Sequence, residues 1–316
     1  MSLLEYSKSY IPIYPQFVEI TKQHEEVHWH EGEAKLQQDV EQWQNGTITQ
    51  KDKYFINMIL RLFTQSDVAV GRDYYDNLIP VFKNNECRNM FGSFAGREGV
   101  HQRAYALLND TLGLGDSFYD EFLEYKEMKD KYDFMLDMTN KSYRDIGISL
   151  AKQCLLEGVC LFASFAMLLN FSRFGKMMGM GDVNQWSIRD ETIHLQGNTA
   201  VFKQFLLEHP KIVNDSFKKE IYDCGRQVIV LEDAFIDLSF AMGAPDGITR
   251  DETKTYARSV CDYRMNQLGF KSEYNVKNPF EWLEWVTNPN GIENFFETNS
   301  TNYSKNSMIG SYSTGY

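Results

Sequence analysis

Apolar residues recur at intervals of three and four along much of the chain, the spacing that places side chains on one face of an α-helix. Two clear runs are Tyr54, Ile56, Ile59, Leu60 and Phe63, and then Val201, Phe202, Phe205 and Leu206. Sustained alternation of apolar and polar residues, which would indicate half-buried β-strands, is hard to find. Because proline disrupts helix interiors, its absence from residues 81–209 permits long helices there. The pattern therefore predicts an all-α protein.

The predicted helices form one domain, and the chain end has a different character. We expect helices near 50–84, 87–110, 116–137, 142–172, 183–208, 211–241 and 250–268, with Asp116, Asp182 and Asp251 as N-caps. No fixed-period repeat and no Gly/Ser linker divides residues 1–297, which are predicted to be a single helical domain. Residues 298–316 have few apolar groups to offset the entropy of ordering, so we expect a flexible tail, either a docking peptide or a solvated terminus.

The composition is that of a globular protein and excludes several classes of function. The chain has 316 residues, of which 43% are hydrophobic and 24% charged, so it is neither disordered nor collagen-like. A net charge of −12 has the wrong sign for general nucleic-acid binding, which depends on Lys and Arg. The longest uninterrupted apolar run, 158–169, is too short to cross a bilayer, and the N-terminus lacks a signal-peptide core. We therefore expect a cytoplasmic protein that does not bind a membrane. Five cysteines without a C-x-x-C pair predict reduced, mostly buried thiols.

Two Glu-x-x-His pairs are the main candidates for chemistry. They are Glu98 with His101 and Glu191 with His194, and a separation of three residues places both members of a pair on one helix face. Either pair alone would be typical of a surface ion pair or a satisfied core histidine. Each, however, lies in a proline-free segment that is predicted to be helical.

Two further carboxylates complete a recognisable ligand pattern. Glu157 interrupts an apolar run, and Asp67 is flanked by apolar residues, so each carboxylate would need a cation if it were buried. Four predicted helices then supply one carboxylate, Glu-x-x-His, one carboxylate and Glu-x-x-His, the ligand set of di-iron and di-manganese four-helix bundles. Four carboxylates neutralise two divalent ions, and oxygen and nitrogen ligands without thiolate suit iron or manganese.

A competing metal motif lies near the N-terminus. His24 to His28 match H-E-x-x-H, the zinc protease helix in which two histidines bind the metal. The surrounding residues are strongly polar, whereas a catalytic zinc helix needs an apolar back face and a third ligand. We therefore interpret this stretch as a solvated face.

The motifs together resemble the small, radical-generating subunit of class I ribonucleotide reductase. The resemblance lies in residues 97–105 (REGVHQRAY), residues 188–195 (IRDETIHL), residues 67–72 (DVAVGR) and Glu157 before an apolar helix, and it covers most of the chain. It implies a ferritin-like helical bundle with a dimetal-carboxylate site in its core. It also implies deoxyribonucleotide synthesis with a large partner subunit, and a homodimer of this chain.

The resemblance assigns roles to individual residues. Asp67, Glu98 and His101 would bind one metal and Glu157, Glu191 and His194 the other, with Glu98 and Glu191 placed to bridge. The resemblance leaves the metals as iron or manganese.

The resemblance also implies a path for the oxidising equivalent. Tyr105, one helical turn beyond His101, would be the tyrosine that is oxidised to a radical. Asp190 and Trp29 would link the metals to the surface. Tyr303, with Tyr312 as a rival, would be the tail tyrosine that passes the oxidising equivalent to the large subunit.

The chain departs from the family pattern near the expected radical. Leu161, Phe165 and Ser187 occupy positions where many members have an apolar pocket rich in Phe and Ile. A hydroxyl at Ser187 could hydrogen-bond Tyr105 or admit water, which leaves open a metal-based oxidant resembling the dimanganese subclass. The chain has no segment resembling the family's regulatory ATP-binding module before the core, so we expect nucleotide regulation in the partner.

Two other functions share parts of the ligand pattern. The first is a dimetal oxidase or hydroxylase of a small organic substrate, although related oxygenases usually have Glu at the position of Asp67. The second is iron storage, which has no use for Trp29, Asp190 or the tail. The radical-generating subunit remains the leading hypothesis because it accounts for all these features.

Overall fold

The computed structural model describes residues 2–287, and within that range the chain is helical with no β-strand. The all-α prediction is therefore confirmed.

The helices of the bundle and its covering layer are α1 (Pro15–Glu26), α2 (Gln37–Gln44), α3 (Gln50–Asp73), α5 (Asn85–Thr111), α7 (Lys126–Leu136), α8 (Tyr143–Leu155), α9 (Phe162–Ser172), α10 (Met178–Glu208), α11 (Asp215–Ser239) and α12 (Arg250–Gln267). Short helices are α4 (Ile79–Val81), α6 (Ser117–Asp120) and α13 (Glu284–Thr287), with 3₁₀ turns at Glu31–Glu33, Glu121–Glu124, Pro210–Ile212 and Glu281–Leu283. The tail with Tyr303 and Tyr312 lies outside the described residues.

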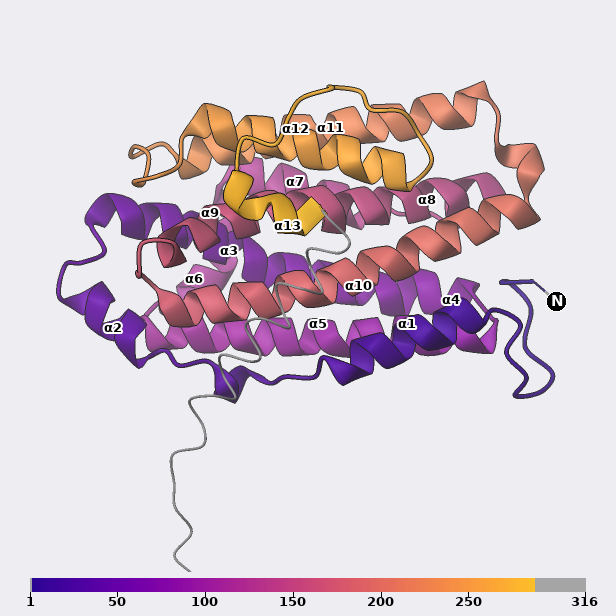
Figure 1. Cartoon of the computed structure of the whole chain (residues 1–316), viewed down its shortest axis with the longest axis horizontal. Helices are drawn as coiled ribbons and strands as arrows, with labels where there is room; N and C mark the ends of the chain where they lie inside the picture. Colours follow the sequence, from indigo (N-terminus) through magenta and orange to yellow (C-terminus); the bar gives the residue numbers. More distant parts are fainter. Residues whose placement is uncertain (1, 288–316) are drawn as a thin grey trace, which may run out of the picture.

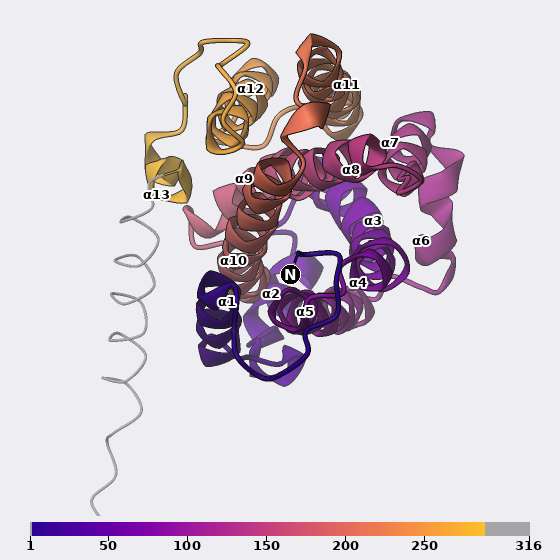
Figure 2. The ribbon, with the colours of Figure 1, turned by 90° about the vertical axis from the view of Figure 1, so that its right-hand side faces the viewer.

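Four long helical columns surround the core of the molecule. They are α3, α5, α10, and the column formed by α8 and α9, and they run along the long axis in Figure 1. Seen end-on in Figure 2, the columns encircle a common axis. Helix α3 packs along α5, and α10 packs on α5 and on the α8–α9 column. This arrangement points one face of each of the four columns at the same interior.

The remaining helices cover the outside of the four columns. Helix α1 packs against α5 and α10, and α11 and α12 lie over the α8–α9 column on the opposite side (Figure 1). The apolar face of α11 is buried through residues such as Phe217, Val228 and Phe235. Helix α7 fills the space between α3 and α11. The covering helices therefore shield the outer surface of the columns on which they pack.

Side-chain caps set the beginnings of most long helices. Thr49 and Asp52 form a reciprocal capping box at the start of α3, and Thr249 and Glu252 do the same for α12. Asn84, Ser142 and Asn214 cap α5, α8 and α11. Of the predicted N-caps, Asp116 does occupy the N-cap position, that of α6, although its side chain makes no capping bond. The other two predictions were wrong, because Asp182 lies inside α10 and Asp251 lies inside the first turn of α12.

Other differences from the predicted helices have local causes. The segment 116–137 is not one helix, because the backbone is extended at Tyr125, between a 3₁₀ turn and α7. Helix α10 begins at Met178, five residues earlier than predicted, after a left-handed residue at Met177. Helices α1 and α2 were not predicted at all, because their apolar positions are sparse.

Two π-helical segments interrupt the columns. They are η2 (Tyr74–Leu78), which continues α3, and η4 (Leu156–Leu161), which joins α8 to α9. A π-helical turn widens the helix locally, and such turns occur frequently at functional sites. Glu157 lies in η4, and Tyr74 begins η2.

Burial in the core explains the most apolar part of the chain. The continuous helical stretch Tyr143–Ser172 is long and apolar enough to span a membrane, but its apolar window is completely buried inside the protein. Its side chains therefore belong to the core of the bundle. The five cysteines are free, and all except Cys224 are buried, in line with the predicted thiols.

Candidate metal centre

The six predicted ligands come together in the interior of the bundle. Asp67 comes from α3, Glu98 and His101 from α5, Glu157 from η4, and Glu191 and His194 from α10. None is more than 3% exposed. Their donor atoms form two groups, each within 4.8 Å: one of Asp67, Glu98 and His101, the other of Glu98, Glu157, Glu191 and His194. Glu98 belongs to both groups.

The local sequence explains how each helix presents its ligands. In α5 and α10 the three-residue spacing places the carboxylate and the imidazole on one face, as the sequence predicted. Packing of α3 on α5 and of α10 on the η4 segment then turns those faces toward each other.

The two imidazoles aim the same ring nitrogen at the same pair of carboxylates. His101 Nδ1 lies 3.4 Å from Glu98 Oε2 and 3.3 Å from Glu191 Oε1. His194 Nδ1 lies 3.1 Å from Glu98 Oε1 and 3.4 Å from Glu191 Oε2. None of the four oxygens of Glu98 and Glu191 makes a hydrogen bond within the described residues, although all are buried. Buried carboxylate oxygens that gather around two imidazole nitrogens and have no other hydrogen-bond partner fit a site built for cations.

The electrostatics point the same way. Burial, with the charge of Glu191, raises the pKa of Glu157 to about 8. Burial also raises the pKa of Asp67 well above its usual value, helped by the charges of Glu98 and Glu191 and opposed by His101. These carboxylates are costly to ionise together in a dry interior, and bound cations would remove that cost. Two divalent ions would be balanced by the four carboxylates, with two neutral imidazoles completing the ligand set.

We call Asp67, His101 and the residues behind them the His101 side of the centre. Asp190 accepts a hydrogen bond from Trp29 Nε1 at 2.6 Å and contacts His101 Nε2 at 3.1 Å. The Arg97 guanidinium donates to the other oxygen of Asp190 at 2.7 Å. A carboxylate behind a ligating histidine fixes its tautomer, so that Nδ1 of His101 is left to bind metal.

Charged neighbours keep Asp190 ionised. Burial alone would raise its pKa, but the hydrogen bond with His101 and the charges of His101, Arg97 and Arg189 lower the pKa below its usual value. Arg97 and Arg189 also donate to the carbonyl oxygen of Val27 at 3.1 and 2.7 Å. The two arginines thereby tie the end of α1, just before Trp29, to α5 and α10.

The chain of contacts on the His101 side continues outward. Trp29 stacks on His101 with ring centroids 5.9 Å apart, and its ring also contacts that of Trp186, with centroids 5.1 Å apart. Trp29 is buried, whereas Trp186 is partly exposed. Contacts therefore connect the predicted ligand His101 to the partly exposed Trp186, which the sequence alone did not indicate.

Tyr105 also lies on the His101 side. Its hydroxyl donates to Asn184 Oδ1 at 2.9 Å, and its ring packs on Phe63 with centroids 5.1 Å apart. The buried Ser187 Oγ and Asn184 Nδ2 have no hydrogen-bond partner among the described residues. The surroundings of Tyr105 are therefore partly polar, as the serine in the sequence suggested. Leu161 and Phe165 are both buried.

We call Glu157, His194 and the residues behind them the His194 side. Three donors hold Glu157: Tyr74 Oη reaches Oε1 at 2.9 Å, Gln153 Nε2 reaches Oε1 at 2.6 Å, and Asn198 Nδ2 reaches Oε2 at 2.8 Å. Asn198 also donates to the Tyr74 hydroxyl at 2.9 Å. Glu157 is thus fixed by protein contacts, whereas Glu98 and Glu191 are not.

His24 supports His194 and corrects our interpretation of the H-E-x-x-H stretch. His24 is buried, with Nε2 3.1 Å from His194 Nε2 and Nδ1 2.7 Å from Ser93 Oγ. His28 is exposed and follows the end of α1, so the two histidines do not share a face. The stretch is therefore not solvated at His24.

Spacing could have indicated some of the residues that sequence reasoning missed. Tyr74 follows Asp67 by seven residues, as Tyr105 follows Glu98, and Gln153 and Asn198 each lie four residues from a ligand of their own helix. His24, Arg97, Asn184 and Trp186 gave no local signal, because only the packing of different helices brings them to the centre.

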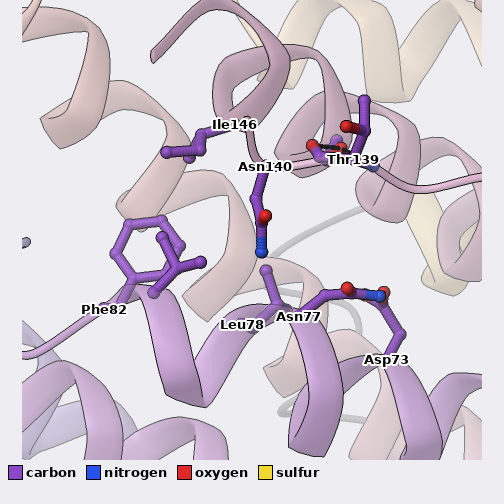
Figure 3. Close-up of a pocket in the computed structure, with 9 residues that line it drawn as sticks. Asp73, Asn77, Leu78, Phe82, Thr139, Asn140 and Ile146 are labelled. Atoms are coloured by element: carbon purple, nitrogen blue, oxygen red, sulfur yellow. Dashed lines mark hydrogen bonds between the residues drawn. The ribbon is translucent and has the colours of Figure 1, made fainter. Parts of the chain in front are cut away.

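Two cavities lie away from the ligands. A narrow one beside η2 contains Asp73, Asn77 and Asn140 and has a volume of about 10 Å³, room for about one water molecule (Figure 3). A larger one of about 560 Å³ lies between α1 and α5, and its lining includes Ser93, the end of the His194–His24–Ser93 chain. Neither lining includes a metal ligand.

The fold and this cluster define a ferritin-like helical protein whose buried carboxylate–histidine cluster could hold metal ions. Residues 9–279 match the family model described as ribonucleotide reductase, small chain. The chain belongs to that family. It is 37% identical to the probable ribonucleoside-diphosphate reductase small subunit of Invertebrate iridescent virus 3 over 95% of this chain and 84% of the relative.

Solved structures share the fold. The homodimer of ribonucleotide reductase Rnr4 from Saccharomyces cerevisiae matches with a TM-score of 0.75 and 19% identity, covering 96% of this chain and 92% of that one. The dimanganese(II) NrdF of Streptococcus sanguinis matches with a TM-score of 0.70 and 18% identity, covering 91% and 99%. The family predicted from the sequence is thus confirmed, which ranks the oxidase and iron-storage alternatives below it.

Proposed function

We propose that this chain is the radical-generating small subunit of a ribonucleoside-diphosphate reductase. It would supply a one-electron oxidant to a large subunit that reduces ribonucleotides to deoxyribonucleotides. The observation that carries the proposal is the buried ligand cluster whose His101 is linked through Asp190 and Trp29 to the partly exposed Trp186. A storage or hydrolytic site has no need for such a connection.

The six buried residues would hold two metal ions, one on each side of the centre. Asp67 and His101 would bind one ion, Glu157 and His194 the other, and Glu98 and Glu191 would bridge, since both face the two imidazoles. The bound metal pair would supply the power to remove one electron from a side chain. The oxygen and nitrogen donors fit iron or manganese, and a structural relative is a dimanganese protein.

The other residues would position groups or carry the oxidising equivalent. Asp190 would hold the tautomer of His101 and keep Trp29 in contact, and the arginine pair would fix the segment on which Trp29 lies. Tyr105 would carry the radical. Its buried ring supports this role because burial keeps water away from it, and its hydroxyl has a neutral acceptor in the Asn184 amide.

Family membership supports two proposals about partner contacts. We propose that residues 298–316 dock on the large subunit and that Tyr303, or its rival Tyr312, receives the oxidising equivalent there. We also propose a homodimer, as in the yeast structural relative.

Reconstitution tests the proposal. Protein loaded with iron or manganese and treated with oxygen or peroxide should support ribonucleotide reduction when mixed with the large subunit. Tyr105→Phe should keep two metals per chain and lose turnover, and so should a chain that ends at residue 297. Turnover at the wild-type rate in Tyr105→Phe would refute the role of Tyr105. Wild-type protein with both metals but no turnover would refute the function.

A further inference from the structure

Tyr74 is a second tyrosine at the centre, on the opposite side from Tyr105. It begins the π-helical segment η2 and is fully buried. Its hydroxyl donates to Oε1 of the ligand Glu157 at 2.9 Å, within the 2.6–3.2 Å range for direct proton transfer. Tyr105, by contrast, donates to an amide oxygen, a far weaker base than a carboxylate.

The surroundings of Tyr74 are suited to a buried radical. Its ring lies among the rings of Phe91, Phe94 and His194, with centroids 5.8, 6.0 and 6.1 Å away. Asn198 donates to its hydroxyl oxygen, and this bond can persist when the oxygen loses its proton. Tyr105 instead lies beside the polar side chains of Asn184 and Ser187.

Resting on the proposed function, we propose that Tyr74 is a second oxidisable tyrosine, which delivers its hydroxyl proton to Glu157 and its electron to the oxidised dimetal centre. The O–H bond of Tyr74 breaks, an O–H bond forms at Glu157 Oε1, and the metal pair is reduced by one electron. The product is a neutral tyrosyl radical. Gln153 and Asn198 hold the carboxylate still, so the proton moves along an existing hydrogen bond.

The geometry assigns a division of labour between the two tyrosines. Tyr74 has a proton acceptor that belongs to a ligand of the metal pair, which favours coupled loss of a proton and an electron. The hydrogen-bonded chain to Trp29 and Trp186, however, starts from the other side of the centre at His101. Oxidation of Tyr74 would therefore produce a radical on the side of the centre from which the contacts to Trp29 and Trp186 do not start.

Electron paramagnetic resonance tests the assignment. Metal-loaded protein is mixed with the oxidant, and samples are frozen at successive times from milliseconds after mixing. Tyr105→Phe should still give a tyrosyl signal, with a line shape different from that of wild type because ring torsions differ. The double variant Tyr105→Phe/Tyr74→Phe should lose that signal. Metal content is measured in every sample, because Tyr74→Phe also removes a hydrogen bond from Glu157.

Two controls separate loss of the ring from disturbance of the ligand. Tyr105→Phe/Gln153→Leu removes another donor from the same Glu157 oxygen and should keep the signal. Tyr105→Phe/Tyr256→Phe removes a buried tyrosine of α12, which packs on Phe280, and should also keep the tyrosyl signal.

The outcomes distinguish this inference from the proposed function. If wild type gives a radical and turnover but Tyr105→Phe with both metals gives no tyrosyl signal, Tyr74 is not oxidised and the function stands. A signal that survives in the double variant assigns it to another tyrosine and overturns the inference. If wild type is silent and inactive, the proposed function fails, and the inference fails with it.

Discussion

The two sides of the metal centre use the same ligand types but are supported by different chemistry. On the His101 side, an ionised carboxylate, Asp190, stands behind the histidine and is paired with Arg97. On the His194 side, the corresponding partner is His24, whose pKa is lowered to about 2 by burial and by the neighbouring His194, so it is neutral. The side with the charged support is also the one whose contacts lead to Trp186.

The carboxylates and tyrosines differ in the same way. Glu157 on the His194 side has three hydrogen-bond donors, including Tyr74, whereas Asp67 on the His101 side has a buried oxygen with no hydrogen bond among the described residues. Tyr105 has an amide acceptor and Tyr74 a carboxylate. A symmetrical ligand set can thus be made unequal by the second layer of contacts alone.

Removal of the shared carboxylate should have the largest effect. Glu98 belongs to both donor groups, so Glu98→Ala is expected to abolish binding of both metals, whereas Asp67→Ala should empty only the His101 side. Elemental analysis after dialysis should give no metal and one metal per chain, respectively. Equal losses in the two variants would show that the sides do not bind separately.

Acid should weaken metal binding at both sides. In the metal-free protein, burial and the charge of Glu191 raise the pKa of Glu157 to about 8. Burial alone would lower the pKa of His194, but Glu191 and Glu98 raise it to about 10. Metal must displace these protons, so affinity should rise with pH up to about 10, where His194 has lost its proton, and fall on acidification.

The expected size of the pH effect is about tenfold per pH unit for each displaced proton. Competition titrations with a chelator at pH 6, 7 and 8 measure it, and protons released into weak buffer give their number. An affinity that does not change with pH would show that the metal-free cluster carries no protons at neutral pH.

The charged support should matter more than the neutral one. Asp190→Asn replaces the ionised partner of His101 and is expected to weaken metal binding on that side by about 10–100-fold. The measurement is calorimetric titration with manganese, with Trp29→Phe as the control that keeps Asp190. Unchanged affinity would contradict the view that Asp190 holds the tautomer of His101.

His24→Phe is the matched change on the His194 side. A neutral hydrogen bond contributes about 0.5–1.5 kcal/mol, roughly half of a charge-assisted one, so the affinity loss should be about tenfold or less. The same titration compares the two variants directly. A loss of metal affinity larger than that of Asp190→Asn would show that the neutral partner His24 contributes more to metal binding than the charged Asp190.

A change far from both sides should leave the metals untouched. Thr249→Ala removes the capping box of α12 and should lower the free energy of unfolding by about 1 kcal/mol. Thermal melting measures that loss, and metal content per chain should remain at two. A loss of metal would show that α12 is coupled to the centre through η4.

The sequence predicted more of the ligands themselves than of the residues that contact the ligands. Four of the six ligands were found because the Glu-x-x-His spacing occurs twice, and Asp67 and Glu157 were found because each is a carboxylate among apolar residues, which are all properties of the local chain. Asp190 and Trp29 came only from the resemblance to a family. The interpretation of the His24 stretch was wrong, since its polar neighbours indicated solvent while the packing of α1 on α5 and α10 buries His24 itself.

By itself, the sequence determined an all-α protein with a dimetal ligand set, because helical periodicity and the Glu-x-x-His spacing are short-range properties that survive in any packing of the helices. Only the tertiary structure decided that His101 is backed by a charged carboxylate and His194 by a neutral imidazole, and that Tyr74 reaches Glu157. Those contacts join residues from 83 to 170 positions apart. These contacts form only when the helices pack in this arrangement, and they also depend on two π-helical turns that the sequence pattern did not predict.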